Sequence, residues 1–106
     1  MLLLYCPCPD LETAQRLAQD LVTHQLVACA NILPGVTSVY TWEGSIRQET
    51  ETLLLAKTTE ACQADVQAYL EKSHPYTCPA ILFLPVESSN AVFENWVNSS
   101  IGKVKY

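Results

Sequence analysis

Glycine and charged side chains are both scarce in this chain of 106 residues, which has only three glycines and 16% charged residues. Phosphate-cradling loops need several closely spaced glycines, so the sequence excludes a nucleotide-binding loop of that kind. The six Lys and Arg residues are scattered and the formal net charge is −5, which argues against a nucleic-acid partner. No apolar run approaches the roughly 20 residues that a membrane-spanning helix needs, so we expect no membrane partner.

Catalytic signatures are absent as well. The sequence has no G-x-S-x-G nucleophile motif and no cysteine–histidine pair with a recognisable local signature. An acylphosphatase-type enzyme would need an arginine in an anion-binding loop after the first strand, where this chain has Cys6-Pro7-Cys8-Pro9-Asp10. We therefore expect a protein that is not an enzyme.

Hydrophobic residues make up 49% of the chain, enough for a buried core. No linker, repeat or low-complexity tract divides the sequence, so we expect a single domain over 1–106. The apolar start at residues 1–5 has no basic flank and no cleavage site, and it predicts a first strand instead of a signal peptide. The five cysteines are an odd number without secretory context, which predicts reduced thiols and a cytoplasmic location.

The first elements follow from short-range patterns. An apolar run at residues 2–6 is typical of a strand that is buried on both faces. Pro7 and Pro9 are expected to end this strand, because proline cannot donate to a β-ladder. Asp10 is a good helix N-cap, and apolar residues at helical spacing predict a helix that runs to about His24.

Two long strands joined by a hairpin are predicted next. The first begins at Leu26 and is expected to bend or bulge at Pro34-Gly35. The second covers 46–58, where side chains alternate between two faces. Tyr40 and Trp42 lie near the tip, which is too long to cover itself in so small a chain. Large exposed apolar patches usually mark interfaces, so we expect these two aromatic residues to contact another subunit.

The second half of the chain predicts a helix, a strand and a short helix. Thr59 is expected to cap a helix that ends before Pro75, and the strand is expected over 80–86. Asn90 is expected to cap the last helix. The residues predicted to face inward are Cys62, Val66, Tyr69 and Leu70 on the first helix and Phe93, Trp96 and Val97 on the second. The order βαββαβ with a C-terminal helix predicts an α+β, ferredoxin-like fold with a four-stranded antiparallel sheet. Its two long helices would leave one sheet face bare, which favours a dimer or trimer.

A series of short motifs runs through the chain in a characteristic order. They are Cys6 with Pro9-Asp10, the segment 26–32, Pro34-Gly35, the segment 38–44, Glu49 with Glu51, Lys57-Thr58-Thr59, Ser73-His74-Pro75-Tyr76, Pro79, Leu84-Pro85-Val86 and Trp96. In this order and spacing they resemble the CutA divalent-cation-tolerance family. The resemblance implies a homotrimer of ferredoxin-like protomers, tolerance of copper and other divalent metal ions, and an architecture similar to PII-type signalling proteins.

The resemblance also implies a metal site. In the family, copper ligation is ascribed to a cysteine after the first strand and to two consecutive histidines, which correspond here to Cys6, Ser73 and His74. One imidazole is therefore replaced by a hydroxyl. Cys8 lies two residues after Cys6, on the same side of an extended backbone, and two thiolates would suit Cu(I). The alternative is that both cysteines are only small buried residues of the core.

Two functions thus remain open on the sequence. The first is a homotrimeric, non-catalytic protein of divalent metal (copper) tolerance, with Cys6, Cys8 and His74 as ligands. The alternative is a PII-like signalling or small-ligand-sensing trimer. In that case a metabolite or anion would bind in clefts between subunits, lined by Glu51, Lys57 and Tyr76.

Overall fold

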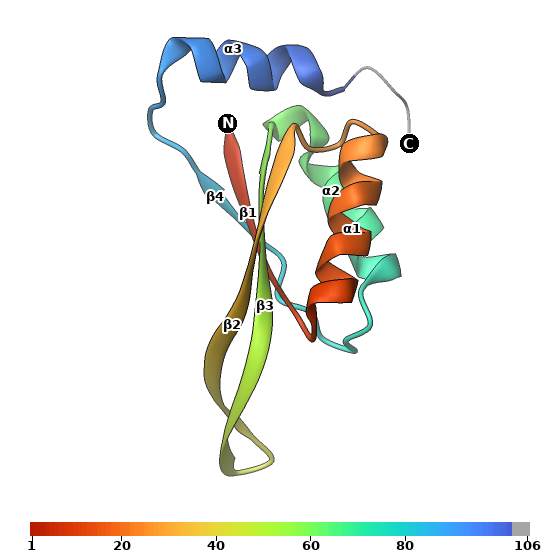
Figure 1. Cartoon of the computed structure of the whole chain (residues 1–106), viewed down its shortest axis with the longest axis vertical. Helices are drawn as coiled ribbons and strands as arrows, with labels where there is room; N and C mark the ends of the chain where they lie inside the picture. The colour runs from red at the N-terminus through yellow and green to blue at the C-terminus, as the bar shows by residue number, and fades with distance from the viewer. Residues whose placement is uncertain (103–106) are drawn as a thin grey trace.

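A four-stranded antiparallel sheet with two long helices packed beside it forms the framework of the chain (Figure 1). The structure, a computed structural model, describes residues 1–102. In chain order, the elements are β1 (Leu2–Cys8), α1 (Leu11–Thr23), β2 (Cys29–Trp42), β3 (Ser45–Thr58), α2 (Glu60–Ser73), β4 (Leu82–Pro85) and α3 (Ala91–Ser100). The sheet order β2-β3-β1-β4 confirms the predicted ferredoxin-like arrangement with an additional C-terminal helix.

The first strand is longer than expected. It continues through Pro7 to Cys8, and Pro7 pairs with Leu53 of β3. The strand thus ends directly before Pro9, as predicted, but the expectation that Pro7 ends it is wrong. The neighbouring strand β4 pairs with β1 only from Leu2 to Tyr5, so Pro7 lies where β1 has a partner on one side. Proline is tolerated at such edge positions, because no ladder hydrogen bond is required there.

The start of α1 confirms the expected cap. The Asp10 carboxylate accepts a hydrogen bond from the backbone N–H of Thr13 at 2.8 Å, which lowers the pKa of Asp10. The helix ends at Thr23, and His24 is its C-cap. The next strand begins at Cys29, three residues later than predicted. Leu26 is instead part of the turn after α1, where its N–H donates to the Leu21 carbonyl at 3.0 Å.

The β2–β3 hairpin projects well beyond the other elements and makes the molecule 45 Å long (Figure 1). The expected irregularity at Pro34-Gly35 is a β-bulge between Leu33 and Val36, with Gly35 at a φ of 77°. At the tip, Glu43 and Gly44 both have positive φ. This is the conformation of a two-residue hairpin turn whose twist matches the right-handed twist of the two strands. This turn fixes the register of both strands.

The core lies between the sheet and the two long helices. Along β3, alternate residues are buried on the helix side: Thr52, Leu54, Ala56 and Thr58. The predicted inward stripe of α2 is buried in full: Cys62, Val66, Tyr69 and Leu70. The Thr58 hydroxyl donates to the carbonyl of Leu26 at 2.7 Å, so this buried polar group has a partner.

The C-terminal elements differ from the prediction in detail. The last strand is shorter than the expected 80–86. On α3, Val97 is buried and Phe93 packs against the core, but Trp96 remains 47% exposed. The prediction that Trp96 faces inward is therefore wrong, because Phe93 and Val97, four residues apart, already form the inward stripe. Among residues 1–102, no helix has the length and hydrophobicity to cross a membrane.

Leu54 provides a test of this core. It is fully buried on β3, so Leu54→Ala should lower the free energy of unfolding by about 2–5 kcal/mol through lost burial and a residual cavity. The matched control is Leu11→Ala at the exposed start of α1, which should cost much less. Urea denaturation followed by circular dichroism measures both. Equal losses in the two variants would contradict the placement of Leu54 at the centre of the core.

Candidate metal centre

Two thiols lie side by side at the end of β1. Cys6 and Cys8 belong to the alternating pattern of β1 in which every second residue faces the helices, and both are fully buried. The extension of the strand through Pro7 causes this arrangement, because residues i and i+2 of a strand point to one side. The predicted shared orientation of the two cysteines is therefore present in the structure.

His74 joins the two thiols from the other end of the fold. It is the C-cap of α2 and is buried against the end of β1. The potential ligand atoms of Cys6, Cys8 and His74 all lie within 4.8 Å of one another. The structure thus brings together the three residues that we predicted as metal ligands, although α1, the hairpin and α2 separate the cysteines from His74 along the chain.

Both ring nitrogens of His74 have hydrogen-bond partners. Nδ1 accepts from the backbone N–H of Tyr76 at 3.1 Å, so Nδ1 carries no proton. Nε2 lies 2.9 Å from the carbonyl oxygen of Pro7, which can only accept, so Nε2 carries the proton and donates it. The two main-chain partners therefore fix one tautomer of the neutral imidazole.

The thiols form an unequal pair. The Cys8 thiol donates to the carbonyl oxygen of Cys6 at 3.6 Å, and the Cys6 thiol donates to that of Pro7 at 4.0 Å. Once a thiolate has formed, the hydrogen bond between the sulfurs lowers the pKa of Cys8 and raises the pKa of Cys6, and burial raises the latter further. Cys8 is therefore the first thiolate of the pair.

These residues fit a thiophilic metal ion. An ion about 2.3 Å from sulfur and about 2.0 Å from nitrogen holds its ligands up to about 4.6 Å apart, close to the spacing of this cluster. Two cysteine sulfurs and one imidazole bind Cu(I) in preference to hard cations, which favour oxygen donors. Ser73 lies next to His74 in the chain, but its carbonyl accepts a hydrogen bond from Arg16 at 3.4 Å, toward α1.

The three residues expected to line a ligand cleft do not meet within one protomer. The Tyr76 hydroxyl donates to Glu51 Oε2 at 2.7 Å, and burial followed by this bond raises the pKa of Tyr76. Lys57 lies six residues along β3 from Glu51, about 20 Å away in an extended strand. Its ammonium group donates to the side-chain carbonyl of Asn31 instead. Glu51 and Tyr76 form a pair, and Lys57 is separate from it.

The aromatic residues predicted for an interface are exposed on the hairpin. Tyr40 is 38% and Trp42 is 54% exposed, and Ile46 on the facing strand is 80% exposed. A hydrogen bond to Glu49 raises the pKa of Tyr40, so the phenol stays protonated on this surface. The hairpin therefore presents apolar side chains to its surroundings.

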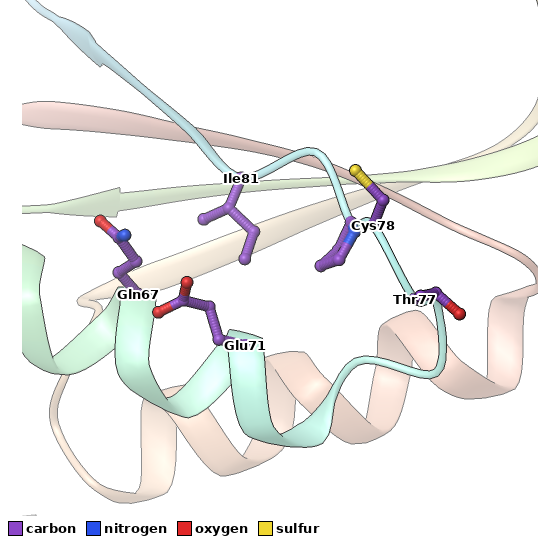
Figure 2. A pocket seen from close by; sticks show the side chains of 6 residues that line it. Gln67, Glu71, Thr77, Cys78 and Ile81 are labelled. Carbon is purple, nitrogen blue, oxygen red and sulfur yellow. The ribbon is translucent and has the colours of Figure 1, made fainter.

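A shallow groove of about 480 Å³ lies beside the loop that follows α2, lined by Gln67, Glu71, Thr77, Cys78, Pro79 and Ile81. Figure 2 shows the loop passing over α2, with Glu71 and Ile81 pointing toward each other and the sulfur of Cys78 turned away from Glu71. The groove shares no residue with the cluster of Cys6, Cys8 and His74. The groove therefore lies between α2 and the loop that follows it.

Sequence reasoning missed the partners of His74. They are the carbonyl of Pro7 and the N–H of Tyr76, both main-chain groups. The available signal was positional: Pro7 lies between the two cysteines, and Tyr76 follows His74 by two residues. Of the other cysteines, Cys62 is buried on α2, as predicted.

Comparison with known proteins gives a consistent result. The model of the family described as CutA1 divalent ion tolerance protein matches residues 2–100. A divalent-cation tolerance protein CutA from Citrobacter koseri is 42% identical over 96 residues, which cover 91% of this chain and 84% of the relative. The solved divalent cation tolerance protein (Cut A1) from Thermus thermophilus superposes with a TM-score of 0.92 at 36% identity, over 96% of this chain and 100% of that one. CutA1 from Oryza sativa superposes with a TM-score of 0.93 at 32% identity, over 96% and 94% of the two chains. This chain therefore belongs to the CutA1 divalent ion tolerance family.

Proposed function

We propose that this protein contributes to metal tolerance by binding a soft metal ion, Cu(I) foremost, between Cys6, Cys8 and His74. The observation that carries the proposal is the convergence of two thiols and an imidazole within 4.8 Å in a buried part of the fold. Such donors select soft and borderline ions, whereas hard cations such as Mg²⁺ prefer oxygen. Cu(I) itself is monovalent; among the divalent ions of the family description, those that suit thiolate or imidazole donors, Zn²⁺ and Cu²⁺, fit these ligands best.

The residues have separate roles in this proposal. Cys8 supplies the first thiolate, since its pKa is lowered by the hydrogen bond from Cys6. Cys6 gives up its proton when the ion binds, because a metal-bound thiol is deprotonated. When bound, the ion would be held mainly by these two sulfurs, and the surrounding core would exclude water from it.

A binding role fits this site better than a catalytic one. Catalytic metal sites keep an open coordination position for water or substrate. Here all three ligands are buried, and the site lies between the end of β1 and the end of α2. The free thiols also favour the cytoplasm, where reducing conditions preserve them.

Assembly into a homotrimer is the second part of the proposal. The cross-strand register places Leu3, Tyr5, Leu55, Leu82 and Leu84 as neighbours on the sheet face away from the helices. Tyr5, Leu82 and Leu84 are all exposed there, and the hairpin adds Tyr40 and Trp42, which pair with Arg47 and Ser45 on the same face. A soluble protein rarely leaves such apolar side chains uncovered together on one sheet face. Two further copies of the chain could cover this face of each protomer around a threefold axis.

The small-ligand alternative has less support. It needs a cation near Glu51 and Tyr76 to attract an anion, but Lys57 is hydrogen-bonded to Asn31 far along β3. A neighbouring subunit would have to supply that charge.

The metal site is tested by competition against a calibrated Cu(I) chelator under reducing conditions. Cys6→Ser should lower the Cu(I) affinity more than about 100-fold, and Cys8→Ser should lower it about 10- to 100-fold, because each removes a soft donor. His74→Ala should cost about tenfold, since both of its nitrogens already have partners. For Cu(II), which prefers nitrogen donors, the loss in His74→Ala should be larger.

Cys62→Ser is the matched control for the titration. It also places a hydroxyl at a buried cysteine, but on α2 and outside the cluster, so the Cu(I) affinity should not change. Equal affinities in the wild type and all four variants would refute the proposed site.

The assembly is tested by light scattering, which should give about three times the protomer mass at micromolar concentration. Trp42→Ala should weaken the trimer by about 3–5 kcal/mol, because a large aromatic residue is lost from the interface. Trp96→Ala is the control, since Trp96 is exposed to a similar degree on α3 and lies outside the proposed contact. A monomeric wild type would contradict the trimer, and so would equal dissociation in the two variants.

A further inference from the structure

Tyr76 contacts the histidine of the metal cluster in two ways and is itself fixed by a third contact. Its backbone N–H donates to His74 Nδ1 at 3.1 Å. Its ring lies 4.8 Å from the imidazole, centroid to centroid, with the planes inclined by 50°. Its hydroxyl donates to Glu51 on β3 at 2.7 Å. A residue in the loop after α2 is thereby tied to a strand on one side and to a potential metal ligand on the other.

The hydrogen bond from Tyr76 occupies the lone pair that a metal ion would need. In the tautomer fixed by Pro7, the only lone pair of the imidazole in the ring plane is on Nδ1, and it accepts from Tyr76. A metal-binding histidine commonly donates its other ring N–H to a carbonyl, which holds the ring in place. The bond from Nε2 to Pro7 already supplies this support. Of the two contacts, the one with Tyr76 is the one that occupies a lone pair of the imidazole.

We propose that Tyr76 and Glu51 form a latch that holds His74 out of metal coordination and releases it after the thiols have captured the ion. This inference rests on the proposed metal site and adds a regulatory step to it. In the latched state, Cys6 and Cys8 are the available donors. In the released state, His74 completes the site as a third donor, and the loop carrying Tyr76 has moved away from the imidazole.

The surroundings of the loop are compatible with this movement. The groove of about 480 Å³ lies between α2 and the segment from Thr77 to Ile81. Figure 2 shows the side chains of Glu71 and Ile81 pointing toward each other beside this segment. Tyr76 is partly exposed and Thr77 and Cys78 are exposed, so little apolar burial opposes a shift of the loop. The hydrogen bonds of Tyr76 to Glu51 and to His74 are contacts that restrain it.

Tyr76→Phe tests the latch, because it removes the bond to Glu51 but keeps the ring and the backbone N–H. Without metal, hydrogen exchange of the amide at position 76 should become about three- to tenfold faster. The affinity for Cu(I), measured by chelator competition, should rise about three- to tenfold, since the competing latched state is less stable. Glu51→Gln should change both quantities in the same direction and by less, because an amide oxygen still accepts a hydrogen bond.

Tyr69→Phe is the matched control. It removes a phenol–carboxylate hydrogen bond of 2.6 Å, here to Asp20, that joins α2 to α1. It should leave amide exchange at position 76 and Cu(I) affinity unchanged. In addition, Tyr76→Phe should no longer affect Cu(I) affinity when combined with His74→Ala, because the latch acts only through the imidazole.

The outcomes separate the latch from the site itself. If the wild type binds Cu(I) through the cysteines and Tyr76→Phe leaves the affinity unchanged, the latch is refuted and the metal site stands. The same conclusion follows if Tyr76→Phe raises the affinity equally with and without His74. If neither the wild type nor Tyr76→Phe binds Cu(I), the proposed function and the latch both fail.

Discussion

The pairing of β1 with β3 is the constraint on which the site depends. In this register, Cys6 lies opposite Leu54 and Cys8 opposite Thr52, both of which face the helices. A shift of one residue would turn both thiols to the other face of the sheet, because strand side chains alternate. The hairpin turn at Glu43-Gly44 and the bulge near Gly35 fix β2 against β3, and the buried leucine layer then fixes β3 against β1. The metal cluster is thus a consequence of strand register.

Short-range patterns predicted most of the fold, because helix and strand periodicity reflect burial directly. The errors occurred where the environment overrides a local preference. Pro7 remains in a strand because the pairing of β4 with β1 ends at Tyr5, so no ladder bond to β4 requires the N–H that proline lacks. The length of β4 cannot be inferred from the residues around Pro7. Leu26 has the composition of a strand residue, yet it closes the turn after α1 by bonding to Leu21. Trp96 is apolar, but the residues of α3 that face the core are Phe93 and Val97, and Trp96 lies beside this stripe.

The candidate site shows a similar division. The spacing of Cys6 and Cys8 predicted their shared orientation, and the family resemblance added His74. The partners of His74 could not be predicted, because main-chain groups carry no residue identity and their positions depend on the path of the loop after α2. Alternation along a strand was also insufficient for Glu51 and Lys57, since residues that follow one pattern can lie far apart along the strand.

Glu51 links the two parts of the proposed function. The pairing between β1 and β3 ends at Thr52, so Glu51 is the first residue of β3 that is paired with β2 alone. Its partner Val36 is the first residue of β2 beyond the bulge. The position of the Glu51 carboxylate therefore depends on how the projecting hairpin is held. In the proposed trimer, neighbouring subunits would contact this hairpin at Trp42. These contacts would restrain the hairpin and keep Glu51 within hydrogen-bond distance of Tyr76. Assembly would then stabilise the latched form of His74. Through β3, which carries Glu51, trimer formation at the hairpin would be linked to metal binding at the buried thiols.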